Sequence, residues 1–184
     1  MGGVRRSALI SLSDLDDTEM RLAKTGKFYI SNPQRSMANN SAVYNEKPST
    51  VKFLEEWLAL AESGAGERGI FNRGGLKKQL PPRRWKVFEK DWATSGMNPC
   101  GEIVLKSKQF CNLTEVVARP EDTEKTLLKK IRLATIIGTY QSTLTNFTYI
   151  SKEWKKNCEE ERLLGVSITG QWDSPSVRVP RTLQ

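Results

Sequence analysis

The sequence predicts an α/β fold, because segments with a strand pattern alternate with segments with a helix pattern. Residues 7–12 alternate small or polar side chains with apolar ones, as a half-buried strand does. Residues 165–170 begin and end with glycine and enclose Val-Ser-Ile-Thr, which predicts a short buried strand. Between them, apolar residues recur at the i, i+3, i+4, i+7 spacing of an amphipathic helix: Leu54, Trp57, Leu58 and Ala61.

Polar and glycine-rich connectors separate the predicted elements in the first half of the chain. Ser13 fits a helix N-cap, and residues 14–24 carry acids in the first turn and basic residues in the last. Residues 27–30 and 41–44 predict short strands around a polar loop. The amphipathic helix follows and ends at Gly64.

The second half of the chain repeats the alternation with longer helices. Residues 113–117 have strand character, and Pro120 begins a long helix that runs past Gly138. A second helix over residues 152–164 is strongly charged on its outer side. The last segment, residues 171–184, has no periodicity and is expected to be a loosely ordered tail.

Composition limits the possible functions. The net charge of +8 favours anionic partners such as nucleotides or acidic proteins, although a solvated basic surface explains it equally well. The chain has no histidine, which excludes a Ser-His-Asp triad or a Cys-His pair within it. Three cysteines do not make a secreted disulfide framework, and no apolar run has the length of a membrane span. These features predict a cytoplasmic protein.

The segment Asn98-Pro99-Cys100-Gly101-Glu102 is the most informative part of the sequence. Proline before Cys100 and glycine after it favour a tight turn that presents the thiol at its tip. In an extended backbone, Asn98, Cys100 and Glu102 face the same side and can address one substrate. The ordinary alternatives are a buried cysteine and a solvated surface acid.

The other thiols carry weaker signals. Cys111 can approach Cys100 if the intervening residues form a hairpin, and a disulfide needs Cα atoms closer than about 7 Å. Cys158 lies on a charged helix and is interpreted as a bystander. A metal site is not predicted, because the third cysteine is far from the other two.

The N-terminal segment Gly2-Gly3-Val4-Arg5-Arg6-Ser7 combines glycines with two arginines before a strand. Such a loop can hold a phosphate or contact a base. The alternative is an ordinary basic N-terminus.

These motifs together resemble the adenosylcobalamin-dependent ribonucleotide reductases. Residues 98–103 resemble the family's finger loop, and Cys111-Asn112-Leu113 follows at the family's spacing. Residues 2–8 resemble the end of the specificity-effector loop. Two further segments, 66–73 and 162–170, match in the family's order. The resemblance implies a partial ten-stranded α/β barrel of the ribonucleotide reductase type, in which residues 1–170 form the central part of the catalytic barrel.

The resemblance also implies a role for each site residue. Cys100 would become a thiyl radical that removes hydrogen from the ribose 3′ carbon, and Glu102 would act as general base on the 3′ hydroxyl. Asn98 would bind the substrate hydroxyls, and Cys111 would be one of two thiols that reduce the sugar. The specificity loop, with Arg5, Arg6 and Ser7, would couple effector binding to base choice.

The implied cofactor is adenosylcobalamin. The implied partners are a ribonucleoside di- or triphosphate, a deoxynucleotide or ATP effector, a thioredoxin-like reductant and the remaining segments of the same enzyme. Neither a membrane nor a nucleic acid is expected. The second reducing thiol, the substrate phosphate loop and a terminal cysteine pair are expected beyond the two ends of this sequence. The 184 residues alone are therefore predicted to be inactive. The alternative function is a non-catalytic basic module, derived from the barrel, that binds a nucleotide or a protein.

Overall fold

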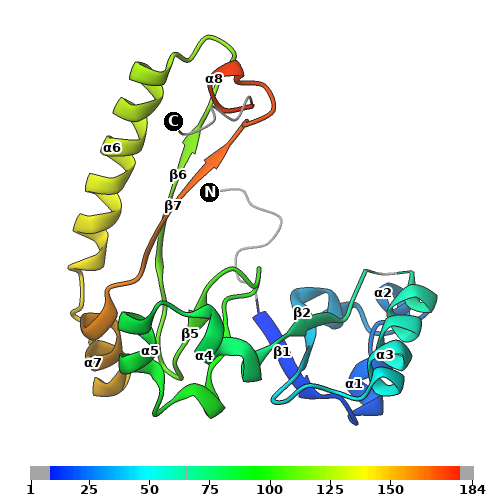
Figure 1. The fold of residues 1–184 in the computed structure, drawn as a ribbon. Coiled ribbons are helices and arrows are strands. Elements are labelled where there is room, and N and C mark those ends of the chain that lie inside the picture. Colours follow the sequence, from blue (N-terminus) through cyan, green and yellow to red (C-terminus); the bar gives the residue numbers. More distant parts are fainter. Residues whose placement is uncertain (1–8, 65, 179–184) are drawn as a thin grey trace. The chain divides into compact units, whose positions relative to one another are not determined.

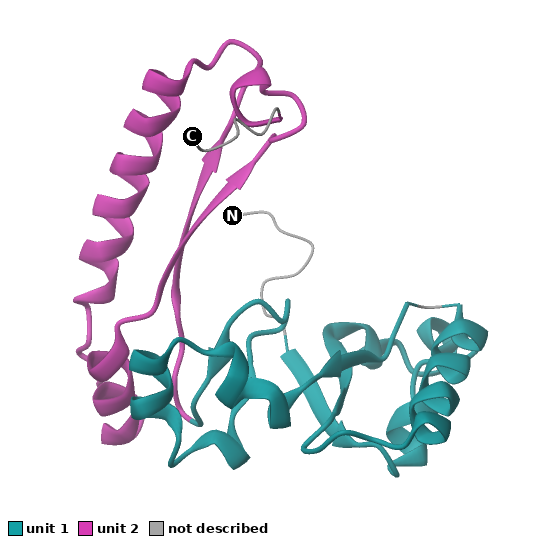
Figure 2. Cartoon of the chain, in the orientation of Figure 1, with its two compact units in different colours: residues 1–107 teal, residues 108–184 magenta. Residues whose placement is uncertain are grey.

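The computed structural model describes residues 9–64 and 66–178, which fall into two compact units, residues 1–107 and 108–184 (Figures 1 and 2). The loop residues Arg5, Arg6 and Ser7 lie outside the described residues.

The first unit is built on a parallel three-stranded sheet with the order β1-β2-β3. The strands are β1 (Leu9–Asp14), β2 (Ala38–Val43) and β3 (Gly69–Phe71). Parallel strands need crossover connections, and helices supply them here. The first connection contains α1 (Thr18–Leu22), α2 (Phe28–Ser31) and the 3-10 turn η1 (Pro33–Met37), and the second contains α3 (Thr50–Ser63).

Short elements complete the first unit. They are η2 (Arg73–Gly75), α4 (Leu76–Gln79), α5 (Pro82–Phe88), η3 (Trp92–Thr94), β4 (Gly96–Met97) and β5 (Val104–Leu105). Strands β4 and β5 pair antiparallel. The buried core joins the sheet to these elements through Val43, Phe71, Leu76 and Phe88. Met97 and Val104 pack against this core, so the β4–β5 hairpin is anchored at its base.

The second unit is a βαβ arrangement. Strands β6 (Asn112–Val117) and β7 (Leu164–Thr169) pair in parallel along their whole length. The connection contains α6 (Glu124–Ser142) and α7 (Lys152–Glu161), and α8 (Pro175–Arg178) follows β7. Its core consists of Val116, Ala118, Leu127 and Ala134. Within the described residues, no helix combines the length and the apolar character needed to cross a membrane.

The α/β class predicted from the sequence is confirmed, because both units combine helices with parallel strands. The described strands form three separate small sheets, and the ten-stranded barrel stays a prediction. The strand at 113–117 is confirmed. The long helix runs past Gly138 as predicted but begins at Glu124 in place of Pro120, and the helix predicted over residues 152–164 ends at Glu161, before β7. The amphipathic helix is confirmed as well, with its end at Gly64. Short helix α8 lies within the tail predicted over residues 171–184.

Three further local predictions are wrong. The helix predicted over residues 14–24 begins only at Thr18, because β1 continues to Asp14 and Asp17 accepts the capping hydrogen bond from the Met20 amide. Residues 27–30 fall in a helical turn in place of a strand. The strand at 164–169 is half-buried, since no side chain along it is fully buried.

The helix α3 is tied to the sheet by a buried ion cluster. Glu56, whose side chain is 3% exposed, accepts hydrogen bonds from Arg68 Nε at 2.5 Å and from Arg21 Nε at 3.0 Å. Arg68 also donates to the Ser13 hydroxyl and the Asp14 carbonyl of β1. Burial alone would raise the pKa of Glu56, but the hydrogen bonds and charges of the two arginines outweigh it and hold the pKa below 4.5.

Replacing Glu56 by glutamine is expected to lower the free energy of unfolding by about 3–5 kcal/mol, because the buried guanidinium group of Arg68 and the half-buried one of Arg21 lose their counter-charge. The folded-state pKa of Glu56 is lowered, so its stabilisation is complete above about pH 5 and is lost as the pH falls through the folded pKa. Urea denaturation followed by tryptophan fluorescence measures both effects. Asp16→Asn, in an exposed ion pair with Lys52, is the control and should change little. Equal losses in the two variants would contradict the prediction.

Candidate active site

The loop between β4 and β5 presents the predicted site residues. The amide of Asn98 donates to the Ile103 carbonyl at 3.0 Å, which closes the loop at its base. The amide of Gly101 donates to the Asn98 carbonyl at 2.9 Å, which makes a tight turn at Pro99 and Cys100. Gly101 has φ +86°, a conformation that side chains disfavour, so glycine is needed directly after the cysteine. Cys100 is exposed at the tip, as the sequence predicted.

The side chain of Asn98 organises the rest of the loop. Its Oδ1 accepts from the Ile103 amide at 2.9 Å, and its Nδ2 donates to Glu102 Oε1 at 2.6 Å. Asn98 is 8% exposed, so the amide is fixed by burial as well as by its hydrogen bonds. The structure therefore brings Asn98 and Glu102 together across the turn that carries Cys100.

The arrangement suits chemistry on a hydroxyl group. Glu102 is exposed and, within the described residues, only its Oε1 is engaged, by Asn98. The other carboxylate oxygen is available to accept a proton from a substrate, while the Asn98 amide fixes the orientation of the carboxylate. A thiol, a carboxylate and an amide on one short loop can thus act on neighbouring atoms of one ligand.

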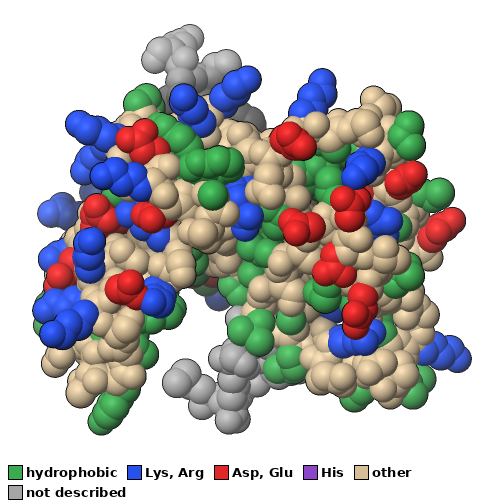
Figure 3. All heavy atoms as spheres, turned by 90° about the horizontal axis from the view of Figure 1, so that it is seen from below, with side chains coloured by type: hydrophobic (Ala, Val, Ile, Leu, Met, Phe, Trp, Pro, Cys, Tyr) green, Lys and Arg blue, Asp and Glu red, His purple; other side chains and the backbone are tan. Residues whose placement is uncertain are grey.

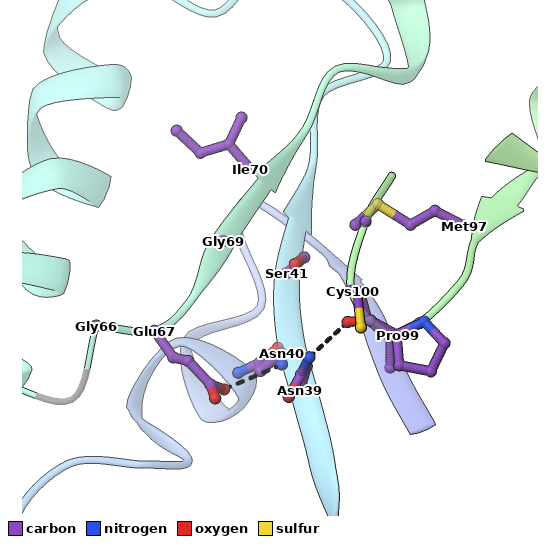
Figure 4. Close-up of a pocket in the computed structure, with 12 residues that line it drawn as sticks. Asn39, Asn40, Ser41, Gly66, Glu67, Gly69, Ile70, Met97, Pro99 and Cys100 are labelled. Carbon is purple, nitrogen blue, oxygen red and sulfur yellow. Dashed lines mark hydrogen bonds between the residues drawn. The ribbon is translucent and has the colours of Figure 1, made fainter. Parts of the chain in front are cut away.

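A pocket of about 380 Å³ opens beside the loop tip (Figure 4). One wall is formed by Met97 of β4 and by the loop residues Pro99, Cys100 and Gly101. The opposite wall comes from β2 and β3 and from the connector before β3: Asn39, Asn40, Ser41, Glu67, Gly69 and Ile70. A side chain at position 69 would meet the Ser41 hydroxyl at 2.8 Å, so Gly69 keeps this wall open.

The β2 wall of this pocket was not predicted from the sequence. Asn39, Asn40 and Ser41 are three consecutive polar residues in a strand, and two of them are buried. Buried polar side chains usually have a specific partner, so a polar run inside a predicted strand was the available signal. Asn39 Nδ2 donates to the Pro99 carbonyl at 2.5 Å, and Asn40 Nδ2 donates to the Met20 carbonyl at 2.6 Å.

The remaining predicted residues lie elsewhere. Cys111 belongs to the second unit, where it directly precedes β6, so its pairing with Cys100 stays a prediction. Cys158 is a buried thiol on α7, and none of Cys100, Cys111 and Cys158 is in a disulfide bond in this structure. Among the described residues, no group of three or more histidine, cysteine or acidic side chains is placed to hold a metal ion.

The amino-acid sequence of the chain is similar to those of several known proteins. A protein of Lacticaseibacillus paracasei is 29% identical to the chain over 177 residues, and a protein of Levilactobacillus brevis is 28% identical over 180 residues. Both are described as adenosylcobalamin-dependent ribonucleoside-triphosphate reductases. The chain is similar to these reductases.

The similarity to these reductases covers 94% of this chain and 22% of each relative, so the chain spans about a fifth of the length of the reductases that it matches. A third reductase, from Lactobacillus acidophilus, matches at 28% identity over 177 residues. No family model and no solved structure matches the chain. The resemblance predicted from the finger-loop and neighbouring motifs is confirmed, and it concerns one segment of these reductases.

Proposed function

We propose that the chain supplies the central segment of the catalytic barrel of an adenosylcobalamin-dependent ribonucleotide reductase, with residues 1–170 forming that segment. Cys100 acts as the hydrogen-abstracting thiyl, Glu102 as general base on the ribose 3′ hydroxyl, and Asn98 as the group that orients both hydroxyl and carboxylate. The substrate is a ribonucleoside triphosphate, since the names of the similar reductases specify triphosphates.

In the proposed reaction, two thiols supply the two electrons that reduce the ribose. The 2′ hydroxyl leaves as water, and the carbon that carried it receives a hydrogen. The two electrons come from Cys111 and a second thiol outside this chain, which close a disulfide. The hydrogen that Cys100 removed from the 3′ carbon returns to the same position. A thioredoxin-like dithiol then reduces the disulfide.

One observation carries the proposal: Asn98 Nδ2 donates to Glu102 Oε1 at 2.6 Å across the turn that exposes Cys100. This contact holds a carboxylate and an amide beside a reachable thiol, and those are the groups that the reaction needs at adjacent ribose carbons. An ordinary surface acid or a buried cysteine would show neither the fixed carboxylate nor the exposed sulfur.

Adenosylcobalamin supplies the initiating radical when it is bound. The residues present fit it in one respect, because the exposed Cys100 thiol is reachable from outside the loop. The adjacent pocket, at about 380 Å³, is near the lower end of the usual range for small-ligand sites, about 300–1,000 Å³. It therefore suits a nucleoside-sized group, and most contacts with a corrin ring would come from other segments.

A chimera tests the proposal. Residues 1–170 replace the matched segment of the Lacticaseibacillus paracasei reductase, and deoxyribonucleotide formation is measured with adenosylcobalamin and a dithiol. We expect turnover by the chimera and none by the 184 residues alone. A shorter graft of residues 96–113 covers the case in which the long graft does not fold. Folded chimeras of both kinds without product from any ribonucleoside triphosphate would overturn the proposal.

The second candidate function is a non-catalytic basic module, which the net charge of +8 favours. On the face shown in Figure 3, however, lysine and arginine side chains are interspersed with acids and do not gather in one patch. Calorimetric titration of the 184 residues with ribonucleoside triphosphates distinguishes the two functions only together with the chimera. Tight binding by the 184 residues combined with folded but inactive chimeras would favour the module.

The proposed enzyme works in the cytoplasm with three further partners. These are the other segments of the reductase, a deoxynucleotide or ATP effector, and the dithiol reductant. The effector would be read by the loop containing Arg5, Arg6 and Ser7.

A further inference from the structure

We infer that Asn39, on strand β2, is a positioning residue that fixes the position and orientation of Cys100 relative to the parallel sheet. The inference rests on the proposed function, because it assigns Asn39 a role in presenting the hydrogen-abstracting thiol. It adds to that function a residue sixty positions before the finger loop and outside its motif.

The tip of the finger loop needs an external anchor. Strands β4 and β5 are only two residues each, and Met97 and Val104 anchor the base of this hairpin on the core, while residues 98–103 are not among the residues packed there. The hydrogen bonds of Asn98 close the loop on itself but leave its tip free to tilt as a unit. Pro99 has no amide hydrogen, so its carbonyl is the one backbone group through which Pro99 can be held.

Asn39 provides that anchor. Its Nδ2 donates to the Pro99 carbonyl at 2.5 Å, directly before Cys100, as Figure 4 shows. Within the described residues, this is the one side-chain hydrogen bond that joins the tip, residues 99–101, to the parallel sheet. The hydrogen bond thereby fixes the position of Cys100 relative to β2, the central strand, which pairs with β1 on one side and β3 on the other.

The backbone around Asn39 is itself fixed from both sides by one ion pair. Lys24 Nζ donates to the carbonyl of Ala38, the preceding residue, at 2.5 Å. Glu67 Oε2 accepts from the amide of Asn40, the following residue, at 3.1 Å. Lys24 and Glu67 are joined at 2.7 Å, and Lys24 is buried. This clamp holds the backbone on both sides of Asn39 in place. The side-chain amide of Asn39 is therefore already positioned to donate to the Pro99 carbonyl.

The structural alternative is that Asn39 only satisfies a polar group beside the sheet. An isosteric change separates the two roles. Asn39→Asp keeps the size of the side chain but replaces its donor by a carboxylate oxygen that faces the Pro99 carbonyl. If Asn39 positions the tip, the change frees the tip and leaves the sheet intact. Asn32→Asp is the matched control, since that side chain contacts Ser31 and Gln34 and lies in the first helical connection.

Amide hydrogen exchange on the 184-residue chain tests the anchor without any assay of activity. In Asn39→Asp, amides of residues 98–103 should exchange about tenfold faster, which corresponds to the loss of one hydrogen bond. Amides of β2 and β3 should change less than about twofold. Asn32→Asp should leave residues 98–103 unchanged. Equal acceleration in the loop and in the sheet would mean general destabilisation and would overturn the inference.

The chimera then tests the consequence for the thiol. Asn39→Asp should lower kcat about 10- to 100-fold with KM within about threefold, since a displacement near 1 Å costs about that much rate. Asn39→Gln, which keeps a donor, should recover part of kcat. An accelerated loop exchange with unchanged kcat would show that the anchor does not serve catalysis and would overturn the inference. That result would leave the proposed function standing, because an active chimera demonstrates it independently.

Discussion

Replacing Cys100 by serine is expected to reduce deoxyribonucleotide formation by the chimera to the background of the assay. A serine hydroxyl has a much stronger bond to hydrogen than a thiol, so it cannot take up the radical that the cofactor generates. Substrate binding should persist, because Asn98 and Glu102 keep their hydrogen bond whichever residue occupies position 100. Turnover assays and equilibrium binding of a ribonucleoside triphosphate measure the two expectations separately.

Cys158 offers the matched control for this substitution. It is a buried thiol on α7 with no place in the proposed reaction. Cys158→Ala should leave turnover within about twofold and cost some stability through its small cavity. Normal turnover in Cys100→Ser would remove the thiyl from the mechanism and with it the main assignment of this site.

The local chemistry of the finger loop could be predicted from sequence because it is contained in six consecutive residues. Proline before Cys100 and glycine after it specify a turn, and the structure confirms an exposed thiol with Gly101 at positive φ. The extended backbone that was expected to place Asn98 and Glu102 on one face is wrong, because residues 98–101 form a turn, and the structure joins the two side chains across that turn. Short-range stereochemistry decides such features, so a single sequence contains the required information.

Long-range contacts were beyond this kind of prediction. The contact between Asn39 and Pro99 joins residues sixty positions apart, and neither segment carries a sequence signal that predicts this contact. The clamp between Lys24 and Glu67 likewise depends on how α1 and the connector before β3 fold onto β2. Both depend on tertiary placement, which periodicity and turn residues do not encode.

The helix α3 shows a different limit, because its predicted apolar face is largely exposed in the structure. Its apolar positions have helical spacing and the helix forms as predicted, but Leu54 is 59% exposed and Trp57 is 49% exposed. The face that packs inward instead carries Glu56, held by Arg68 and Arg21. Apolar periodicity identifies a helix face that can be buried, but it does not show whether another part of the protein covers that face.

Replacing Glu102 by glutamine is expected to lower kcat of the chimera by about 10²–10⁴-fold, the usual contribution of a general base. Glutamine retains a side-chain oxygen that can accept from Asn98 Nδ2, so the loop geometry should survive the change. What is lost is the carboxylate oxygen that accepts the proton of the 3′ hydroxyl. Substrate affinity should change little, because the amide of Asn98 and the exposed thiol remain in place.

A second variant at the same position separates proton transfer from geometry. Glu102→Asp keeps the carboxylate but shortens the side chain by one carbon, which breaks its contact with Asn98 and withdraws the base from the substrate. It should retain more activity than Glu102→Gln if proton transfer dominates, and less if fixing the loop is the main role of Glu102. Amide exchange of residues 98–103 provides the independent check, since only the shortened side chain should loosen the loop. A glutamine variant with kcat near that of the parent chimera would contradict the assignment of Glu102 as the base, and its contact with Asn98 would then be structural.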